Sequence, residues 1–219
     1  MMNSSLEAQV LQIIRDNPEV IMEAIQNYQK DEEDRVRALR EKFAQEIQTK
    51  PAGVICSSPT TGATEQNIVL VEFSDFQCPL CSQASDKVKE FIDKHQDEVT
   101  LTYKHLPLTS IHSEALPAAQ AAFAAQKQGK FWDYHDALFT QQDKLGEELY
   151  LEIAQSLSLD MELFDRDRHS NEAEAAVDRD IQLADRLGIK KTPFFFLNQQ
   201  DFSGVLEVSE MEKILEKVK

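Results

Sequence analysis

Two cysteines separated by two residues are the feature of this sequence best suited to chemistry. They form Cys78-Pro79-Leu80-Cys81, in which two thiols can alternate between a dithiol and a small closed disulfide. The motif follows an apolar, β-branched run at residues 68–73 and opens an amphipathic pattern, so the predicted order is strand, CxxC, helix. Unpaired N–H groups at the helix start favour a thiolate at Cys78. We expect Cys78 to attack and the more covered Cys81 to resolve.

A metal site and an inert staple are the alternatives to redox exchange. Structural zinc needs about four Cys or His ligands, and the third cysteine, Cys56, has neither a second CxxC nor a histidine pair beside it. A disulfide across so short a loop contributes little stability. We therefore predict redox chemistry without a metal or organic cofactor. A non-catalytic, thiol-based metal carrier or partner-docking protein is the alternative from another functional class.

The composition argues against several kinds of partner. Of 219 residues, 39 are acidic and 23 basic, for a net charge of -16, whereas nucleic-acid binding requires clustered Lys and Arg. No apolar run approaches the ~20 residues of a membrane span. Residues 1–15 lack a signal-peptide pattern. We expect a mature extracytoplasmic form, such as a periplasmic one, that has lost its signal; a cytosolic protein is the alternative.

Residues 1–49 form a predicted N-terminal helical segment with a break at Asn17-Pro18. In the second helix a narrow apolar seam follows a charged block, and its members are Val36, Leu39, Phe43 and Ile47. A narrow seam on a long charged helix is typical of an oligomer interface, although docking onto the chain's own globular domain gives the same pattern. We favour a homo-oligomer assembled through residues 5–48.

Residues 50–67 are rich in turn residues, which predicts a linker, and Cys56 lies in it. The globular part spans 68–219. Its periodicity predicts strand, helix, strand, a helical block at about 110–188, then strand, strand and helix. That order is an α/β thioredoxin fold with a large helical insertion, and the CxxC lies at its first strand-to-helix junction.

Three separated segments give this order a family resemblance. Residues 72–81 (EFSDFQCPLC), 130–139 (KFWDYHDALF) and 191–196 (KTPFFF) resemble the active-site segment, the insertion signature and the cis-proline loop of DsbA-like proteins in the thioredoxin superfamily. Residues 17–21 (NPEVI) are similar to the N-terminal segment of ScsC-like and Com1-like members, which mediates assembly in trimeric disulfide isomerases of that kind. The resemblance implies a protein disulfide oxidoreductase with cysteine-containing protein substrates and a redox partner protein.

The resemblance also implies site residues. It makes the Thr192-Pro193 peptide cis and places it opposite the CxxC, where Thr192 backbone groups would pair with a substrate peptide. An ordinary trans proline at an edge strand is the alternative. Glu72 would be a buried acid that exchanges a proton with Cys81, and Lys104 could pair with it. The alternative is an exposed position for Glu72 at a strand end.

Two departures from the family pattern concern the active-site dipeptide and a loop. The dipeptide is Pro79-Leu80, whereas strongly oxidising members carry His before the second cysteine. Because Leu80 stabilises the thiolate less, we expect a weaker oxidant. Residues 199–204 are predicted to form a longer loop than the family's usual tight turn. Oxidase, isomerase and reductase activities all remain open at this point.

Overall fold

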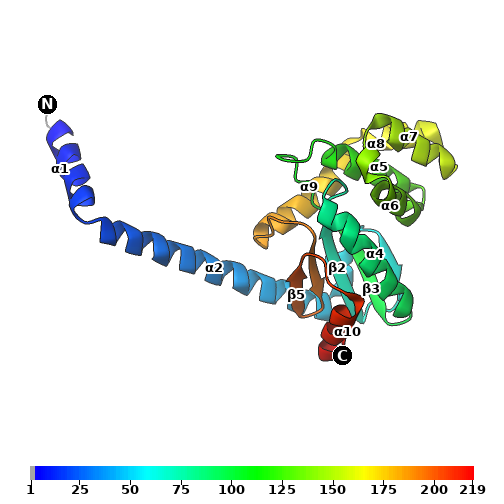
Figure 1. The fold of residues 1–219 in the computed structure, drawn as a ribbon, viewed down its shortest axis with the longest axis horizontal. Coiled ribbons are helices and arrows are strands. Elements are labelled where there is room, and N and C mark those ends of the chain that lie inside the picture. The colour runs from blue at the N-terminus through cyan, green and yellow to red at the C-terminus, as the bar shows by residue number, and fades with distance from the viewer. Residues whose placement is uncertain (1–2) are drawn as a thin grey trace. The chain divides into compact units, whose positions relative to one another are not determined.

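The computed structural model describes residues 3–219, with side chains from Leu6 onward. The chain forms two compact units, one that ends at Arg40 and one that comprises Glu41–Lys219. Figure 1 shows the secondary structure. In chain order the elements are α1 (Asn3–Asp16), α2 (Pro18–Thr49), α3 (Pro51–Ile55), β1 (Thr60–Gly62), β2 (Ile68–Ser74), α4 (Pro79–Lys94), β3 (Val99–His105), α5 (Ala115–Lys127), α6 (Phe131–Thr140), the short 3-10 helix η1 (Gln142–Lys144), α7 (Glu147–Ser156), α8 (Met161–Arg168), α9 (Asn171–Arg186), β4 (Phe194–Leu197), β5 (Gln200–Ser203) and α10 (Val208–Val218).

The strands of the second unit form one mixed sheet in the order β1-β3-β2-β4-β5. Only β2 and β3 are parallel neighbours, and α4 connects them, while the other pairs are antiparallel. Every residue of β2 is buried, which is typical of a central strand covered on both faces. Helices α5 to α9 follow β3 and precede β4. The predicted α/β thioredoxin fold with a helical insertion is therefore confirmed.

The two faces of the sheet carry different residues because side chains alternate along each strand. On one face Leu70, Leu101 and Phe195 pack against α4 and α10, and we call it the α4 face. The register pairs Glu72 with Tyr103, so both lie on the α4 face as well. The opposite face contacts α9, and we call it the α9 face.

The hairpin between β4 and β5 is tighter than expected. Leu197 pairs with Gln200, which leaves a two-residue turn whose first residue, Asn198, has φ of 47°. Asn tolerates this left-handed conformation, and two-residue hairpin turns require it. The last strand therefore covers residues 200–203, within the stretch predicted as a loop, and the predicted long loop is wrong.

Residues 50–67 are also more ordered than the predicted linker. They contain α3 and β1, and β1 pairs with β3 in the sheet. Gly62 lies in that strand with φ of 83°, and a Cβ there would be 2.3 Å from the carbonyl oxygen of Val99. Glycine is needed at position 62 because the backbones of β1 and β3 approach closely there. Residues 50–67 belong to the second unit.

The boundary between the units lies within α2, at Arg40, and not after residue 49. Phe43 and Ile47 are buried in the second unit, and the Phe43 ring contacts Phe196 edge-on with centroids 5.0 Å apart. This half of the predicted seam therefore docks onto the chain's own domain, because the aromatic α9 face of β4 offers it an apolar partner.

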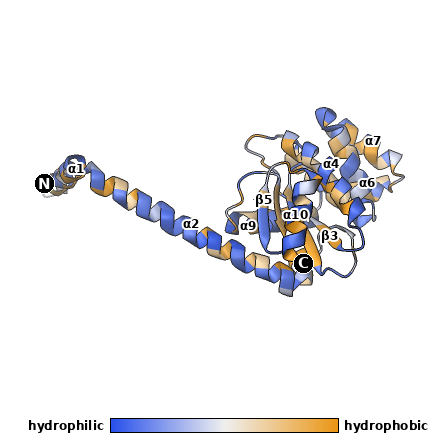
Figure 2. Ribbon diagram, turned by 60° about the horizontal axis from the view of Figure 1, so that its bottom comes forward, coloured by the Kyte–Doolittle hydropathy of each residue, from blue (hydrophilic) through white to orange (hydrophobic). Residues whose placement is uncertain are grey.

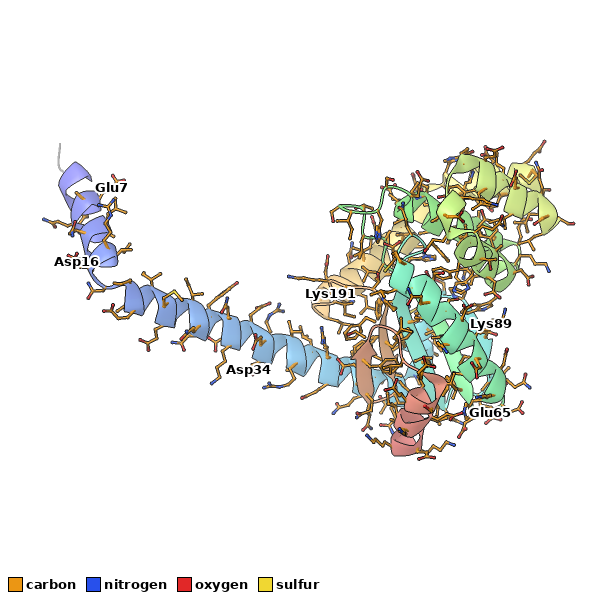
Figure 3. The ribbon with its side chains drawn as sticks, viewed as in Figure 1. Glu7, Asp16, Asp34, Glu65, Lys89 and Lys191 are labelled. Atoms are coloured by element: carbon orange, nitrogen blue, oxygen red, sulfur yellow. The ribbon has the colours of Figure 1, made fainter. Side chains whose placement is uncertain are left out.

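The first unit consists of α1 and most of α2, separated by the predicted break at Asn17. Hydrophilic and hydrophobic residues alternate along both helices (Figure 2). Charged side chains such as Glu7, Asp16 and Asp34 project from them (Figure 3). Large apolar side chains are exposed as well, namely Leu6, Val10, Leu11, Ile13, Ile14, Val20, Ile21, Met22, Ile25 and Tyr28. Such a surface is typical of an interface.

Candidate active site

Cys78 occupies the N-cap position of α4, and Pro79 follows as the first helical residue. Proline suits this position because its missing N–H would have had no helical partner. The Cys78 sulfur lies 3.5 Å from the carbonyl oxygen of Thr192. Cys78 retains 7% exposure, whereas Cys81 is fully buried, and both are free thiols. The expected contrast between an accessible and a covered cysteine is thus present.

Hydrogen bonding sets the protonation of the two thiols apart. The pKa of Cys78 is lowered from 9.0 to about 5. The largest cause is a hydrogen bond from the Cys81 thiol, and the Thr192 side chain and the backbone N–H groups of Cys81 and Leu80 add to it. Burial, and then its donation to Cys78, raises the pKa of Cys81. The pair therefore holds one thiolate and one thiol at neutral pH, with the charge on the more accessible sulfur.

Thr192 and Pro193 reach the CxxC from the turn that precedes β4. Their peptide bond is cis. Because β4 is the antiparallel neighbour of β2, the start of β4 and the end of β2 lie at the same edge of the sheet. The two segments singled out in the sequence are therefore brought together, although they are far apart along the chain.

Glu72 is buried in the central strand β2, with 1% of its surface exposed. Burial raises its pKa from 4.5 to about 7, and the nearby Ser74 hydroxyl opposes the shift. Tyr103 lies across the strand from Glu72, and its pKa is raised well above 10.0 by burial and then by the charges of Glu72 and Cys81. Glu72 and Cys81 therefore share one buried environment around the Tyr103 phenol.

Lys104 does not pair with Glu72. It is the partner of Phe73 in the register, so its side chain lies on the opposite, α9 face. There its ammonium nitrogen is 2.8 Å from Ser58 Oγ and 3.5 Å from Asp180 Oδ1. The suggested Glu72–Lys104 ion pair is wrong because adjacent strand residues point to opposite faces.

Three polar side chains fix the loop that carries Cys78. The buried Asp75 carboxylate accepts hydrogen bonds from the backbone N–H groups of Gln77 and Leu108 and contacts His112 Nδ1 at 2.7 Å. From η1, the amide of Gln142 donates to the carbonyl oxygens of Phe76 and Cys78 at 2.8 and 2.9 Å. The helical insertion thus holds the backbone on both sides of Gln77.

The buried histidines His105 and His135 pack among aromatic rings. Both contact Tyr103 and Phe76 with ring centroids 5.2–6.2 Å apart. Burial lowers the pKa of each, that of His105 to about 3. They are therefore neutral at physiological pH and act as packing residues in this aromatic cluster.

A family model described as thioredoxin matches residues 56–217. The chain belongs to the thioredoxin family. A thioredoxin-like oxidoreductase from Silicibacter pomeroyi DSS-3 is similar at 31% identity and a TM-score of 0.68, covering 74% of this chain and 92% of that one.

Two further thioredoxin-fold structures resemble the chain at lower identity. The thiol-disulfide exchange protein alpha-DsbA2 from Wolbachia pipientis has 20% identity and a TM-score of 0.73, covering 85% of this chain and 98% of that one. Proteus mirabilis ScsC in a transitional conformation has 21% identity and a TM-score of 0.70, covering 99% and 96%. At this identity the agreement concerns the fold, and with ScsC it extends over nearly the whole chain.

The curated relatives are longer proteins. The Na(+)/H(+) antiporter NhaA 3 of Salinispora tropica is 36% identical over 143 residues, which are 65% of this chain and 22% of that protein. The NhaA 1 of Mycolicibacterium gilvum is 32% identical over 157 residues. The chain spans about a quarter of the length of these relatives. None of the helices in residues 3–219 is long and apolar enough to cross a membrane.

Several residues around the thioredoxin-family CxxC were not singled out in the sequence. Ser74 could have been found, since it lies two residues after Glu72 and therefore on the same face. Tyr103 required the register between β2 and β3. Gln142 is in a polar stretch of the insertion and carries no sequence signal that relates it to Cys78. Among the described residues, no group of three or more His, Cys, Asp or Glu is arranged to hold a metal ion.

Proposed function

We propose that this protein catalyses thiol-disulfide exchange on cysteine-containing protein substrates through Cys78 and Cys81. One observation carries the proposal: the lowered pKa of Cys78 beside a buried Cys81 whose pKa is raised. A thiolate at the accessible position and a held proton at the covered one form an attacking and resolving pair.

The exchange conserves atoms and electrons. In the reducing direction the Cys78 thiolate attacks one sulfur of a substrate disulfide, that bond breaks, and the other substrate sulfur leaves as a thiolate and takes up a proton. Cys81 then loses its proton and attacks Cys78, which releases the second substrate thiol and leaves the Cys78–Cys81 disulfide. The oxidising direction is the reverse, and a redox partner protein restores the starting form. Neither direction calls for a metal or organic cofactor.

Glu72 is the group proposed to accept and return the Cys81 proton. Its pKa of about 7 allows both protonation states near neutral pH, as a general acid and base needs. Transfer would pass through the buried space shared with Ser74 and Tyr103. Thr192 and Pro193 are proposed to hold the substrate chain beside Cys78, since the Thr192 carbonyl already contacts its sulfur. Pro79 sets the helix start, and Leu80, which is 49% exposed, faces outward.

The N-terminal unit is proposed to assemble the protein into a homo-oligomer. The exposed apolar residues of α1 and early α2 support this, and the similarity to ScsC covers that region. Assembly would set several CxxC sites around a shared space, which favours repeated attack on wrongly paired disulfides and thus isomerase activity. An extracytoplasmic location is proposed with it, because one similar structure is described as a periplasmic thioredoxin-like protein from Salmonella enterica serovar Typhimurium.

Two assays on the intact chain test the function. Insulin reduction with a chemical reductant measures exchange, and refolding of a scrambled disulfide protein measures isomerisation. Cys78→Ser should abolish both, whereas Cys81→Ser should accumulate mixed disulfides that are visible on non-reducing gels. Full insulin-reducing activity in Cys78→Ser would overturn the assignment. Mass measurement after exposure to zinc or copper distinguishes the metal-carrier alternative, which predicts retained metal.

A further inference from the structure

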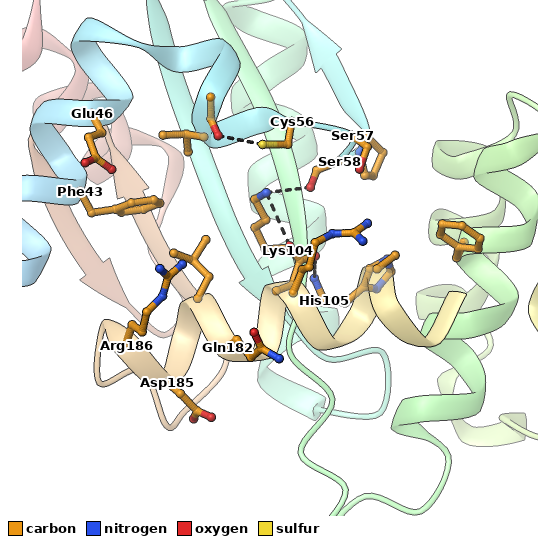
Figure 4. Close-up of a pocket in the computed structure, with 18 of the residues that line it drawn as sticks. Phe43, Glu46, Cys56, Ser57, Ser58, Lys104, His105, Gln182, Asp185 and Arg186 are labelled. Atoms are coloured by element: carbon orange, nitrogen blue, oxygen red, sulfur yellow. Dashed lines mark hydrogen bonds and ion pairs between the residues drawn. The ribbon is translucent and has the colours of Figure 1, made fainter. Parts of the chain in front are cut away.

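The connection between β3 and α5, residues 106–114, is anchored where it begins. The His105 N–H donates a hydrogen bond to Asp180 Oδ2 of α9 at 2.9 Å. The next N–H, that of Leu106, donates to the carbonyl oxygen of Ser74 at the end of β2, also at 2.9 Å. Figure 4 shows His105 at this end of β3, with α9 beside it. The connection therefore starts from a fixed point next to the segment that leads into the CxxC.

Asp75, the residue that follows β2, is bound to both cysteines through its backbone. Its carbonyl oxygen accepts a hydrogen bond from the Cys78 N–H at 3.1 Å. Its own N–H donates to the Cys81 sulfur at 3.5 Å. Because Cys81 is fully buried, bulk water cannot take the place of this donor. The direction of the Asp75 N–H therefore affects how well the Cys81 sulfur can carry a negative charge.

The Asp75 side chain is held by three donors. It is fully buried, and its Oδ1 accepts a hydrogen bond from the Gln77 N–H at 2.8 Å, which forms an Asx turn. Its Oδ2 accepts one from the Leu108 N–H at 2.9 Å and lies 2.7 Å from His112 Nδ1. An ionised carboxylate only accepts hydrogen bonds, so Nδ1 carries a hydrogen. Two of the three donors are backbone groups, and His112 is the one that a substitution can remove.

The pKa values of the two cysteines place the effect of Asp75 on the resolving sulfur. Burial raises the pKa of Cys81 most, and the Asp75 N–H is among the groups that oppose this effect. The pKa of Cys78 is lowered mainly by Cys81, Thr192 and Leu80. A change in the direction of the Asp75 N–H should therefore affect Cys81 and leave the attacking thiolate almost unchanged.

We propose that His112 is a positioning residue for the resolving step, in which it holds the Asp75 N–H toward the Cys81 sulfur. The inference rests on the proposed exchange function. In the resolving step Cys81 gives its proton to Glu72, and its sulfur attacks the Cys78 sulfur. A new S–S bond joins the two cysteines, and the substrate sulfur leaves as a thiolate with the electron pair of the broken bond. Charge develops on Cys81 as its proton leaves, and a donor that already points at it lowers the barrier.

One reaction of the full-length chain measures attack and resolution separately. The exposed thiol of Cys56 is removed by Cys56→Ser, and the reduced protein is mixed with the chromogenic disulfide dithiobis(nitrobenzoate). Attack by Cys78 releases a first coloured thiolate at a rate that depends on the reagent concentration. Attack by Cys81 on the resulting mixed disulfide releases a second one at a rate that does not. Stopped-flow absorbance therefore reports the two steps as two phases.

His112→Phe keeps an aromatic ring but has no donor, and it should slow the second phase about tenfold, as expected when a hydrogen bond to an ionised sulfur is weakened. The first phase should not change. His112→Asn can place its amide nitrogen where Nδ1 lies and should restore most of the parent rate. His169→Phe, the same change at an exposed histidine after α8, should alter neither phase.

Three results would overturn the role of His112. One is a second phase in His112→Phe as fast as in the parent chain. Another is equal slowing of both phases, which indicates a general loss of the site. The third is a second phase in His112→Asn as slow as in His112→Phe, since the donor would then not be the cause. A parent chain without a second phase is a different result, because it would remove the resolving role of Cys81 and the proposed function with it.

Discussion

The Cys78 sulfur and the Thr192 carbonyl oxygen are 3.5 Å apart, although 114 positions separate the two residues in the chain. The contact exists because β4 runs antiparallel beside β2, which brings the start of one strand to the end of the other. A peptide that pairs with the backbone at Thr192 would place its own cysteine next to the attacking sulfur. The remaining parts of the site can be tested one at a time.

The first prediction concerns the protonation of Cys78. Its alkylation by iodoacetamide should be half-maximal near pH 5 and not near 9.0, because hydrogen bonds hold its pKa at about 5. Since the folded pKa lies below the unfolded one, the thiolate stabilises the reduced fold fully above pH 9 and loses this effect as the pH falls through 5. Cys78→Ser should abolish the alkylation that has its midpoint near pH 5. A midpoint near that of a free thiol would contradict the assignment.

Gln142→Ala should raise the Cys78 pKa by roughly 0.5–1 unit. The variant removes two hydrogen bonds to the backbone around Cys78, each worth about 1 kcal/mol net. The pH profile of alkylation measures the shift, which a loss of stability alone would not produce. Gln141→Ala is the matched control, being the same change one position earlier. Equal profiles for the two variants would show that Gln142 does not position the nucleophile.

Glu72→Gln should stabilise the reduced protein at high pH and leave it unchanged at low pH. Because the folded pKa is raised from 4.5 to about 7, ionisation of Glu72 opposes folding increasingly as the pH rises through that window. The gain should approach about 3 kcal/mol above pH 7 and vanish below 4.5. Urea unfolding at about pH 4 and 8 measures it. The same variant should slow release of mixed disulfides, and unchanged release would remove the proton-transfer role.

Leu80→His should make the protein a stronger oxidant. An imidazole before Cys81 can donate a hydrogen bond to the thiolate, which the leucine side chain cannot. Stabilisation of the reduced form by one further pKa unit corresponds to about 30 mV in reduction potential. A glutathione redox titration of the two forms measures the difference. Leu80→Ala, which removes bulk without adding a donor, should leave the potential near that of the parent chain.

The role of the N-terminal unit is tested by two truncated chains. A chain that starts at Glu41 keeps Phe43 and Ile47 and should be monomeric, folded and redox-active but a poorer isomerase. One that starts at Pro51 loses both buried side chains and should be less stable by roughly 4–8 kcal/mol. Light scattering and urea unfolding report the two effects. A monomeric intact chain at micromolar concentration would contradict assembly and favour simple oxidase or reductase activity.

The order of strands and helices was predictable because each segment has a clear periodicity, and the CxxC fixed which strand comes first. The docking of α2 was not predictable. Val36, Leu39, Phe43 and Ile47 form one regular seam, and a regular seam says nothing about its partner. Only the position of Phe196 in β4 decides that Phe43 is covered within the chain. Likewise, the turn at Asn198 was hidden because a single residue with positive φ shortens the loop.

The candidate site divides in the same way. Cys78, Cys81 and the Thr192-Pro193 pair come together as expected, because the fold brings these two segments to one edge of the sheet. Their supporting residues were out of reach of the sequence. Asp75, His112 and Gln142 act through contacts across 37 to 66 positions, and no local pattern encodes such distances. The predicted pairing of Lys104 with Glu72 was wrong because the register between β2 and β3 was not known. That register places Lys104 beside Phe73, on the opposite face of the sheet from Glu72.

The two outer strands of the sheet have a consequence for the proposed action on incompletely folded chains. Such chains expose unpaired strands of their own, which add readily to any free sheet margin. Here β1 has three residues and β5 four, and β5 carries the acidic Asp201. Edge strands this short expose few unpaired backbone N–H and C=O groups. They therefore limit the addition of further strands and the co-aggregation that would follow. If the proposed function holds, the chain can therefore exchange disulfides with an incompletely folded substrate without joining its aggregate by strand addition.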